Sequence, residues 1–76
     1  MSQFNRVVKV AKGRKWWTLR MLENAIGRQY GVHDSSPAIS ARLRSTAKLA
    51  NLGLKKDVKV ERINEKNVWF YRLVKI

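Results

Sequence analysis

Residues 35–51, SSPAISARLRSTAKLAN, decide the fold that we expect for this chain of 76 residues. Ser36 followed by Pro37 predicts a helix start, because a serine oxygen accepts from free amide groups and a proline is harmless in the first turn. The buried face of this helix is marked by small or apolar residues at helical spacing, namely Ile39, Leu43, Thr46 or Ala47, and Ala50. We therefore predict one helix over 36–50, which ends before Gly53.

Two further helices are predicted upstream of this stretch. The first covers 3–12 with Ser2 as its N-cap, and the second begins after Thr18 and ends at Gly27 or at about Tyr30. The apolar positions that support them are Phe4, Val7, Val8 and Ala11 in the first helix, and Leu19, Leu22 and Ile26 in the second.

Trp16 and Trp17 lie between these two helices and suggest a very short strand. Neighbouring side chains on an extended segment point to opposite sides. We therefore expect one indole to anchor the core and the other to lie at the surface.

The last third of the chain changes to a strand pattern. Val58 and Val60 alternate with polar residues, 64–67 is a polar turn, and 68–74 is rich in β-forming residues. This pattern predicts a hairpin over 58–74. On its second strand we assign the side with the larger rings to the core, that is Trp69, Tyr71 and Leu73. Phe70 is then expected to be exposed, which suggests a surface for a partner.

The predicted order is helix, short extended piece, helix, turn, helix and hairpin. We therefore predict a single α+β domain over 1–76, with three short helices followed by a C-terminal hairpin, which is the order of a winged helix-turn-helix.

Three segments carry a resemblance to a known family. Residues 17–27, WTLRMLENAIG, resemble the second helix of many bacterial and phage helix-turn-helix domains. Residues 38–44, AISARLR, resemble the recognition helix of small phage-type winged-helix proteins, and 68–73, VWFYRL, is similar to their final wing strand. The resemblance implies a winged helix-turn-helix that binds double-stranded DNA, as a transcriptional or phage-type regulator does. Two spacings are longer than is usual in the family: the nine residues between Gly27 and Pro37, and the segment 45–56.

Charge points to the same class of partner. Seventeen Lys and Arg face five Asp and Glu, which gives a net charge of +12 and an isoelectric point near 11.1. A folded domain with such a surplus attracts polyanions, and nucleic acid is the commonest polyanion inside cells. The surplus is spread along the chain, and 35–51 contains three cations and no acid. The chain has no cysteine and no apolar run long enough to span a bilayer, so we expect a cytoplasmic, nucleoid-associated protein without a membrane partner.

The predicted DNA-binding residues fall into three groups. Those on or beside the helix over 36–50 are Ser35, Ser36, Ser40, Ala41, Arg42, Arg44 and Lys48. Those before the second helix, where they would clamp the DNA backbone, are Arg14, Lys15 and Thr18, and those near the wing tip are Lys66 and Asn67. Arg44 is predicted to read guanine through a bidentate contact, and Ala41 to touch a thymine methyl. The alternative is that the serines only cap the helix and that the cations are only solvated or phosphate-bound.

Other functions remain open at this point. A winged-helix scaffold can instead bind a partner protein or a second copy of the chain. Trp16, Trp17, Phe70 and Tyr71 could stack on single-stranded RNA or DNA. We expect no enzyme and no cofactor, because the single His33 beside Asp34 is a poor catalytic constellation and no acids cluster as a metal site.

Overall fold

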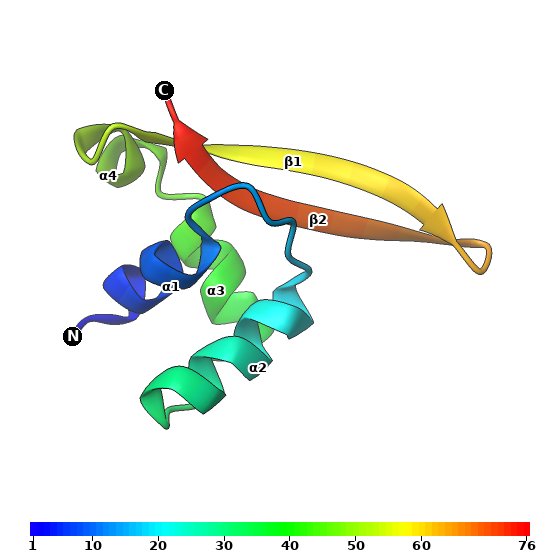
Figure 1. Ribbon diagram of the computed structural model, residues 1–76, viewed down its shortest axis with the longest axis horizontal. Coiled ribbons are helices and arrows are strands. Elements are labelled where there is room, and N and C mark those ends of the chain that lie inside the picture. Colours follow the sequence, from blue (N-terminus) through cyan, green and yellow to red (C-terminus); the bar gives the residue numbers. More distant parts are fainter.

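The computed structural model describes the whole chain, residues 1–76, and is an α+β fold with four helices and one antiparallel hairpin. The elements are α1 (Gln3–Ala11), α2 (Leu19–Tyr30), α3 (Ser36–Leu43), α4 (Thr46–Asn51), β1 (Leu54–Ile63) and β2 (Lys66–Lys75). The helices gather beneath one end of the hairpin, and the other end of the hairpin projects clear of them (Figure 1). The α+β class is confirmed, but the number of helices is four and not three.

Hydroxyl caps begin the first two helices, as predicted. Ser2 Oγ accepts from the amide of Asn5 at 3.1 Å, and Thr18 Oγ1 accepts from the amide of Met21 at 3.1 Å. Gly31 ends α2 in the left-handed conformation, with φ 67°. Because α2 continues to Tyr30, the long spacing before Pro37 is filled by an extra helical turn, and the connection to α3 is short.

The start of α3 differs from the prediction by one residue. Ser35, and not Ser36, is the N-cap, since its Oγ accepts from the amide of Ala38 at 3.3 Å. The backbone ladder also begins there, because the amide of Ile39 donates to the Ser35 carbonyl at 2.9 Å. Ser36 is already helical, so its side chain is free of the capping role.

The single helix predicted over 36–50 is wrong, because the chain breaks at Arg44 and Ser45 into α3 and α4. The break turns α4 so that Leu49 is buried, while Thr46, Ala47 and Ala50, which were predicted to be inward, are exposed. Burying a leucine removes more apolar surface from water than burying alanine or threonine, and this gain favours the break. The segment 45–56 therefore contains α4 and the start of β1.

The hairpin is longer than predicted, with ten residues in each strand. The chain reverses in a two-residue turn at Asn64 and Glu65, which have φ of 50° and 63°. Turns with two positive φ values match the twist of the flanking strands. The four-residue turn predicted over 64–67 is therefore wrong, since Lys66 and Asn67 pair with Ile63 and Arg62 in the ladder.

The piece between α1 and α2, where a very short strand was predicted at Trp16 and Trp17, forms two single bridges to β2, one from Lys12 to Leu73 and one from Trp17 to Tyr71. The Trp17 amide donates to the Tyr71 carbonyl at 2.8 Å, and the Tyr71 amide donates back at 2.7 Å. Trp17 packs against the core. Trp16 is half-buried, beneath the guanidinium of Arg72 at 4.1 Å. Trp17 is therefore the indole that packs against the core, and Trp16 lies at the edge of the molecule under Arg72.

The core is built from every helix and from the base of the hairpin. Its eleven buried apolar residues are Val7, Val8, Val10, Ala11, Leu22, Ile26, Ile39, Leu43, Leu49, Leu54 and Leu73. Trp69 was predicted to belong to it but is 53% exposed, because its part of the hairpin lies beyond the helices. Phe70 was predicted to be exposed but is half-buried, with the ammonium of Lys59 5.2 Å from its ring.

No helix is both long and apolar enough to cross a membrane.

Candidate nucleic-acid interface

The outward side of α3 is formed by short side chains and carries no acid. Ile39 and Leu43 are fully buried, which orients the helix, while Ser40 and Ala41 are half-buried and Arg44 is exposed at the C-cap. The outer side therefore presents a hydroxyl, a methyl group and a guanidinium within two turns. A helix with such short side chains can approach base edges closely.

The two serines at the start of α3 have different roles. The hydroxyl of Ser35 is engaged with the amide of Ala38, whereas that of Ser36 makes no hydrogen bond within the chain. Arg42 is half-buried on the flank of the helix, and its Nε is buried without a hydrogen-bond partner.

Lys48 does not extend the α3 surface as the sequence suggested. It lies on α4, beyond the break, and its ammonium is 5.7 Å from the ring centre of Phe4 in α1. The structure therefore brings Ser40, Ala41 and Arg44 together and places Lys48 on a different element.

An ion pair fixes the turn that leads into α3. Asp34 is only 4% exposed and accepts from Arg6 Nε and Nη2, both at 2.8 Å, and from Gln3 Nε2 at 3.1 Å. The hydrogen bonds from Arg6 hold the pKa of the Asp34 carboxyl below its usual value, and they raise the pKa of Arg6. This pair ties α1 to the residue just before the cap of α3, so it sets where α3 begins.

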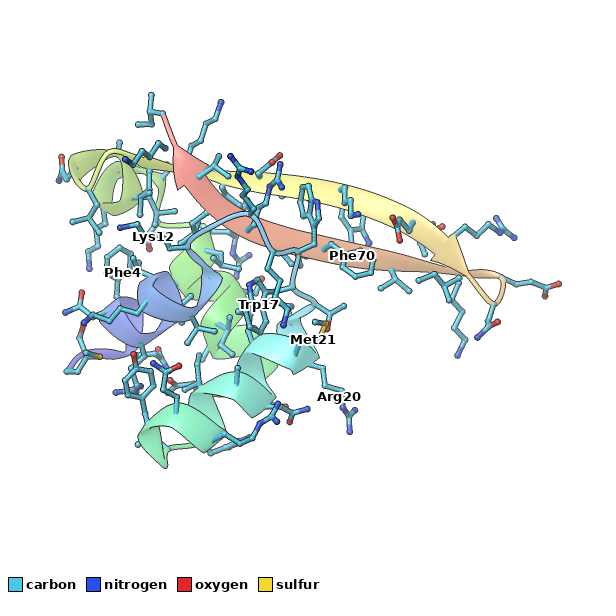
Figure 2. The ribbon with its side chains drawn as sticks, in the orientation of Figure 1. Phe4, Lys12, Trp17, Arg20, Met21 and Phe70 are labelled. Carbon is cyan, nitrogen blue, oxygen red and sulfur yellow. The ribbon has the colours of Figure 1, made fainter.

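The start of α2 supplies a second basic region. Arg14 and Lys15 are exposed, and the ammonium of Lys15 lies 4.2 Å from the ring centre of Trp17. The hydroxyl of Thr18 is engaged as the helix cap. Arg20, which is not among the predicted DNA-binding residues, is exposed on the first turn of α2 and extends away from the helical body (Figure 2). The helical period places Arg20 on the side of α2 opposite the buried Leu22 and Ile26, so its exposure could have been predicted from the sequence.

The two faces of the hairpin differ in charge. The register places five β1 residues on the side of the core, namely Leu54, Lys56, Val58, Val60 and Arg62, with their β2 partners Asn67, Trp69, Tyr71, Leu73 and Lys75. We call this the helix-side face, and it contains no acid. The opposite side, the outer face, carries both strand acids, Asp57 and Glu61.

Both acids of the outer face are neutralised. Asp57 accepts from Arg72 Nε at 2.8 Å, and Glu61 accepts from Lys59 Nζ at 3.0 Å. The ammonium of Lys59 also lies between Trp16 and Phe70, 4.9 and 5.2 Å from their ring centres. Trp17 and Tyr71, in contrast, pack against the core. The four aromatic residues considered for single-strand stacking are therefore divided between two faces.

Most of the positive charge has no acidic partner. Three of the five acids, Asp34, Asp57 and Glu61, form ion pairs with an Arg or Lys, Glu23 contacts His33, and Glu65 in the hairpin turn has no partner. Only three of the seventeen Lys and Arg side chains are used in these pairs, namely Arg6, Lys59 and Arg72. The other fourteen, which include Lys66 at the exposed end of the hairpin, have no acidic partner.

His33 and Asp34 do not form a pair with each other. His33 Nε2 lies 3.1 Å from Glu23 Oε2, at an exposed position, and Asp34 is taken by Arg6. No three His, Asp or Glu side chains lie close enough together to hold a metal ion.

Comparison with known proteins adds no relative. No protein-family model, no curated protein and no solved structure matches this chain.

Proposed function

We propose that this protein binds double-stranded DNA as a regulator of the winged helix-turn-helix type, with α3 in the major groove and the hairpin as a wing. The observation that carries the proposal is the surface of α3 and its C-cap, which has short outward side chains, two arginines (Arg42 and Arg44) and no acid. A groove lined by phosphates favours such a surface and disfavours one that contains carboxylates.

The arrangement of elements supports the same proposal. α2 and α3 pack against each other across a short turn, and the hairpin follows them in the chain. The Trp17 piece bridges β2 in the manner of a third strand. In this geometry Arg44 contacts base edges, Ser40 and Ala41 lie at the groove floor, and Ser36 and Arg42 contact the phosphates beside them.

Cations outside α3 contact the DNA backbone in this proposal. Arg14, Lys15 and Arg20 hold the strand that runs past the start of α2, and Lys66 with Asn67 reaches the backbone from the wing. Such contacts fix position and carry no sequence information.

The first test is a titration of a labelled duplex of random sequence at several salt concentrations. With about six phosphates neutralised, the logarithm of the affinity should fall with the logarithm of the salt concentration at a slope of about −5. A chain that binds no duplex even at low salt contradicts the proposal.

The second test separates base reading from charge. Arg44→Ala should reduce the preference among duplex sequences, whereas Lys66→Ala should weaken binding to all of them alike. Arg28→Ala is the matched control, because Arg28 is exposed in the last turn of α2, away from the helix start. Equal effects of Arg44→Ala and Arg28→Ala would remove α3 from the interface.

A partner protein is the second candidate. A hollow between α4 and the hairpin is lined by the apolar residues Leu49, Ala50, Leu54 and Ile76 together with Thr46, Lys55 and Lys56, and Leu52 is exposed at the end of α4. A protein that binds there would be displaced by Ala50→Lys and unaffected by Arg44→Ala.

A further inference from the structure

On the helix-side face, the half of the hairpin nearest the turn carries an apolar strip, which no other part of the chain covers. Trp69 is 53% exposed, and Val60, its direct partner across the ladder, is 44% exposed. Val58 continues the strip toward the core. This half of the hairpin projects beyond the helices (Figure 1), so the strip lies on the side of the helical body but is not shielded by it.

Trp69 differs from the other two tryptophans. Lys59 and Arg72 both lie over the ring of Trp16 and Lys15 lies over the ring of Trp17, whereas no cation lies over Trp69. Its indole face is therefore available to a ligand.

The charges around this strip indicate which class of ligand binds to it. The residues that flank it on the same face are Lys56, Arg62 and Asn67, and no acid lies on that face. A second copy of a chain with net charge +12 would set like charges against each other across the strip. A polyanion that also offers apolar surface fits better. The grooves of a DNA duplex are of this kind, because they are bordered by phosphates and lined by apolar parts of the sugars and bases.

From these observations we propose that Trp69, supported by Val60, enters the minor groove of duplex DNA as an apolar wedge, with Arg62 on the adjacent phosphates. This inference rests on the proposed function, since it requires α3 in the neighbouring major groove. Trp69 lies opposite Val60, in the half of the hairpin that projects beyond the helices, so its indole can approach a duplex without obstruction from the helical body.

A wedge between base steps has a defined physical effect. Apolar side chains that enter the minor groove partly unstack a step and allow the duplex to wrap more of the protein. Trp69 thus adds affinity that does not depend on salt, in contrast to the cations around it.

The test compares duplex binding by the full chain and by three variants. Trp69→Ala should weaken binding about tenfold, as expected for the loss of an aromatic contact with a base, and Trp69→Phe should recover part of it. Ile63→Ala is the matched control, because Ile63 is 43% exposed at the same end of the hairpin but on the outer face. Its affinity should stay within about twofold of the parent. The exposed position of Trp69 predicts that all variants fold, and circular dichroism checks this.

Two further readouts identify the groove and the oligomeric state. The fluorescence of Trp69, obtained as the difference between the parent and Trp69→Phe, should be quenched when duplex is added. A drug that occupies the minor groove should abolish the difference in duplex affinity between the parent and Trp69→Ala. Equal affinities of parent and Trp69→Ala overturn the wedge and leave the proposed function standing, whereas no duplex binding by the parent overturns both. Equal losses in Trp69→Ala and Ile63→Ala, or a parent dimer that Trp69→Ala dissociates, also overturn the wedge.

Discussion

Arg6 and Asp34 form a two-pronged ion pair, in which Nε and Nη2 each lie 2.8 Å from a carboxylate oxygen, and this pair joins α1 to the turn before α3. Asp34 is the only buried charged residue of the chain. Its burial means that its partners determine whether the turn is stable, since an unpaired buried charge is strongly unfavourable.

Asp34→Asn should therefore lower the free energy of unfolding by about 1–3 kcal/mol, because the amide cannot accept both hydrogen bonds from Arg6. In a domain of this size each kcal/mol lowers the melting temperature by roughly 4–8 °C. Thermal unfolding followed by circular dichroism measures the change. Glu65→Gln is the control, since it removes an exposed charge without an ion-pair partner, and a drop of the same size there would argue against the pair.

Acid should weaken the fold through the same residue. The pKa of Asp34 is lowered in the folded chain, so its stabilising effect is complete above the ordinary pKa of an aspartate and is lost as the pH falls through the lowered value. Urea unfolding at a series of pH values should show stability falling below about pH 4. Asp34→Asn should flatten this dependence, and an unchanged profile would show that other carboxylates control acid unfolding.

The position of the helix break predicts which residue of α4 matters for stability. Leu49→Ala should cost about 2–5 kcal/mol, because Leu49 is fully buried, and Ala50→Ser should be close to neutral. Chemical denaturation of both variants tests this. The reverse ranking would support a continuous helix over 36–50.

The hairpin turn offers a stabilising substitution. Glu65 has a φ of 63°, which costs a residue with a side chain about 1–2 kcal/mol relative to glycine. Glu65→Gly should raise the free energy of unfolding by about 0.5–1 kcal/mol, and it should also strengthen duplex binding because it removes an exposed acid that has no partner in the chain. Lys66→Gly, one residue later in β2, should instead destabilise the hairpin. A less stable Glu65→Gly variant would contradict the turn geometry.

Local sequence signals predicted those parts of the fold that depend on neighbours in the chain. The caps at Ser2 and Thr18, the end of α2 at Gly31 and the alternation along the hairpin all follow from local chemistry. The break between α3 and α4 was not predictable in this way, because it depends on where Leu49 meets the hairpin. A continuous helical pattern and a broken one are equally consistent with the sequence there.

The candidate site was predictable only in part for the same reason. Arg44, Ser40 and Ala41 follow from the helical period of α3. Trp69 was misplaced, because alternation shows which side chains share a face but not how far the helices extend beneath that face. Trp69 is exposed because its half of the hairpin projects beyond the helices, and this is a property of the three-dimensional arrangement.

The most direct measurement of the central claim is a titration of isotope-labelled protein with a short duplex, followed by the NMR shifts of its backbone amides. Binding through α3 and the wing predicts the largest shifts over 36–44, at Arg20 and on the hairpin near Trp69. Shifts confined to the hollow lined by Leu49, Leu54 and Ile76, or to the outer face of the hairpin, would contradict it.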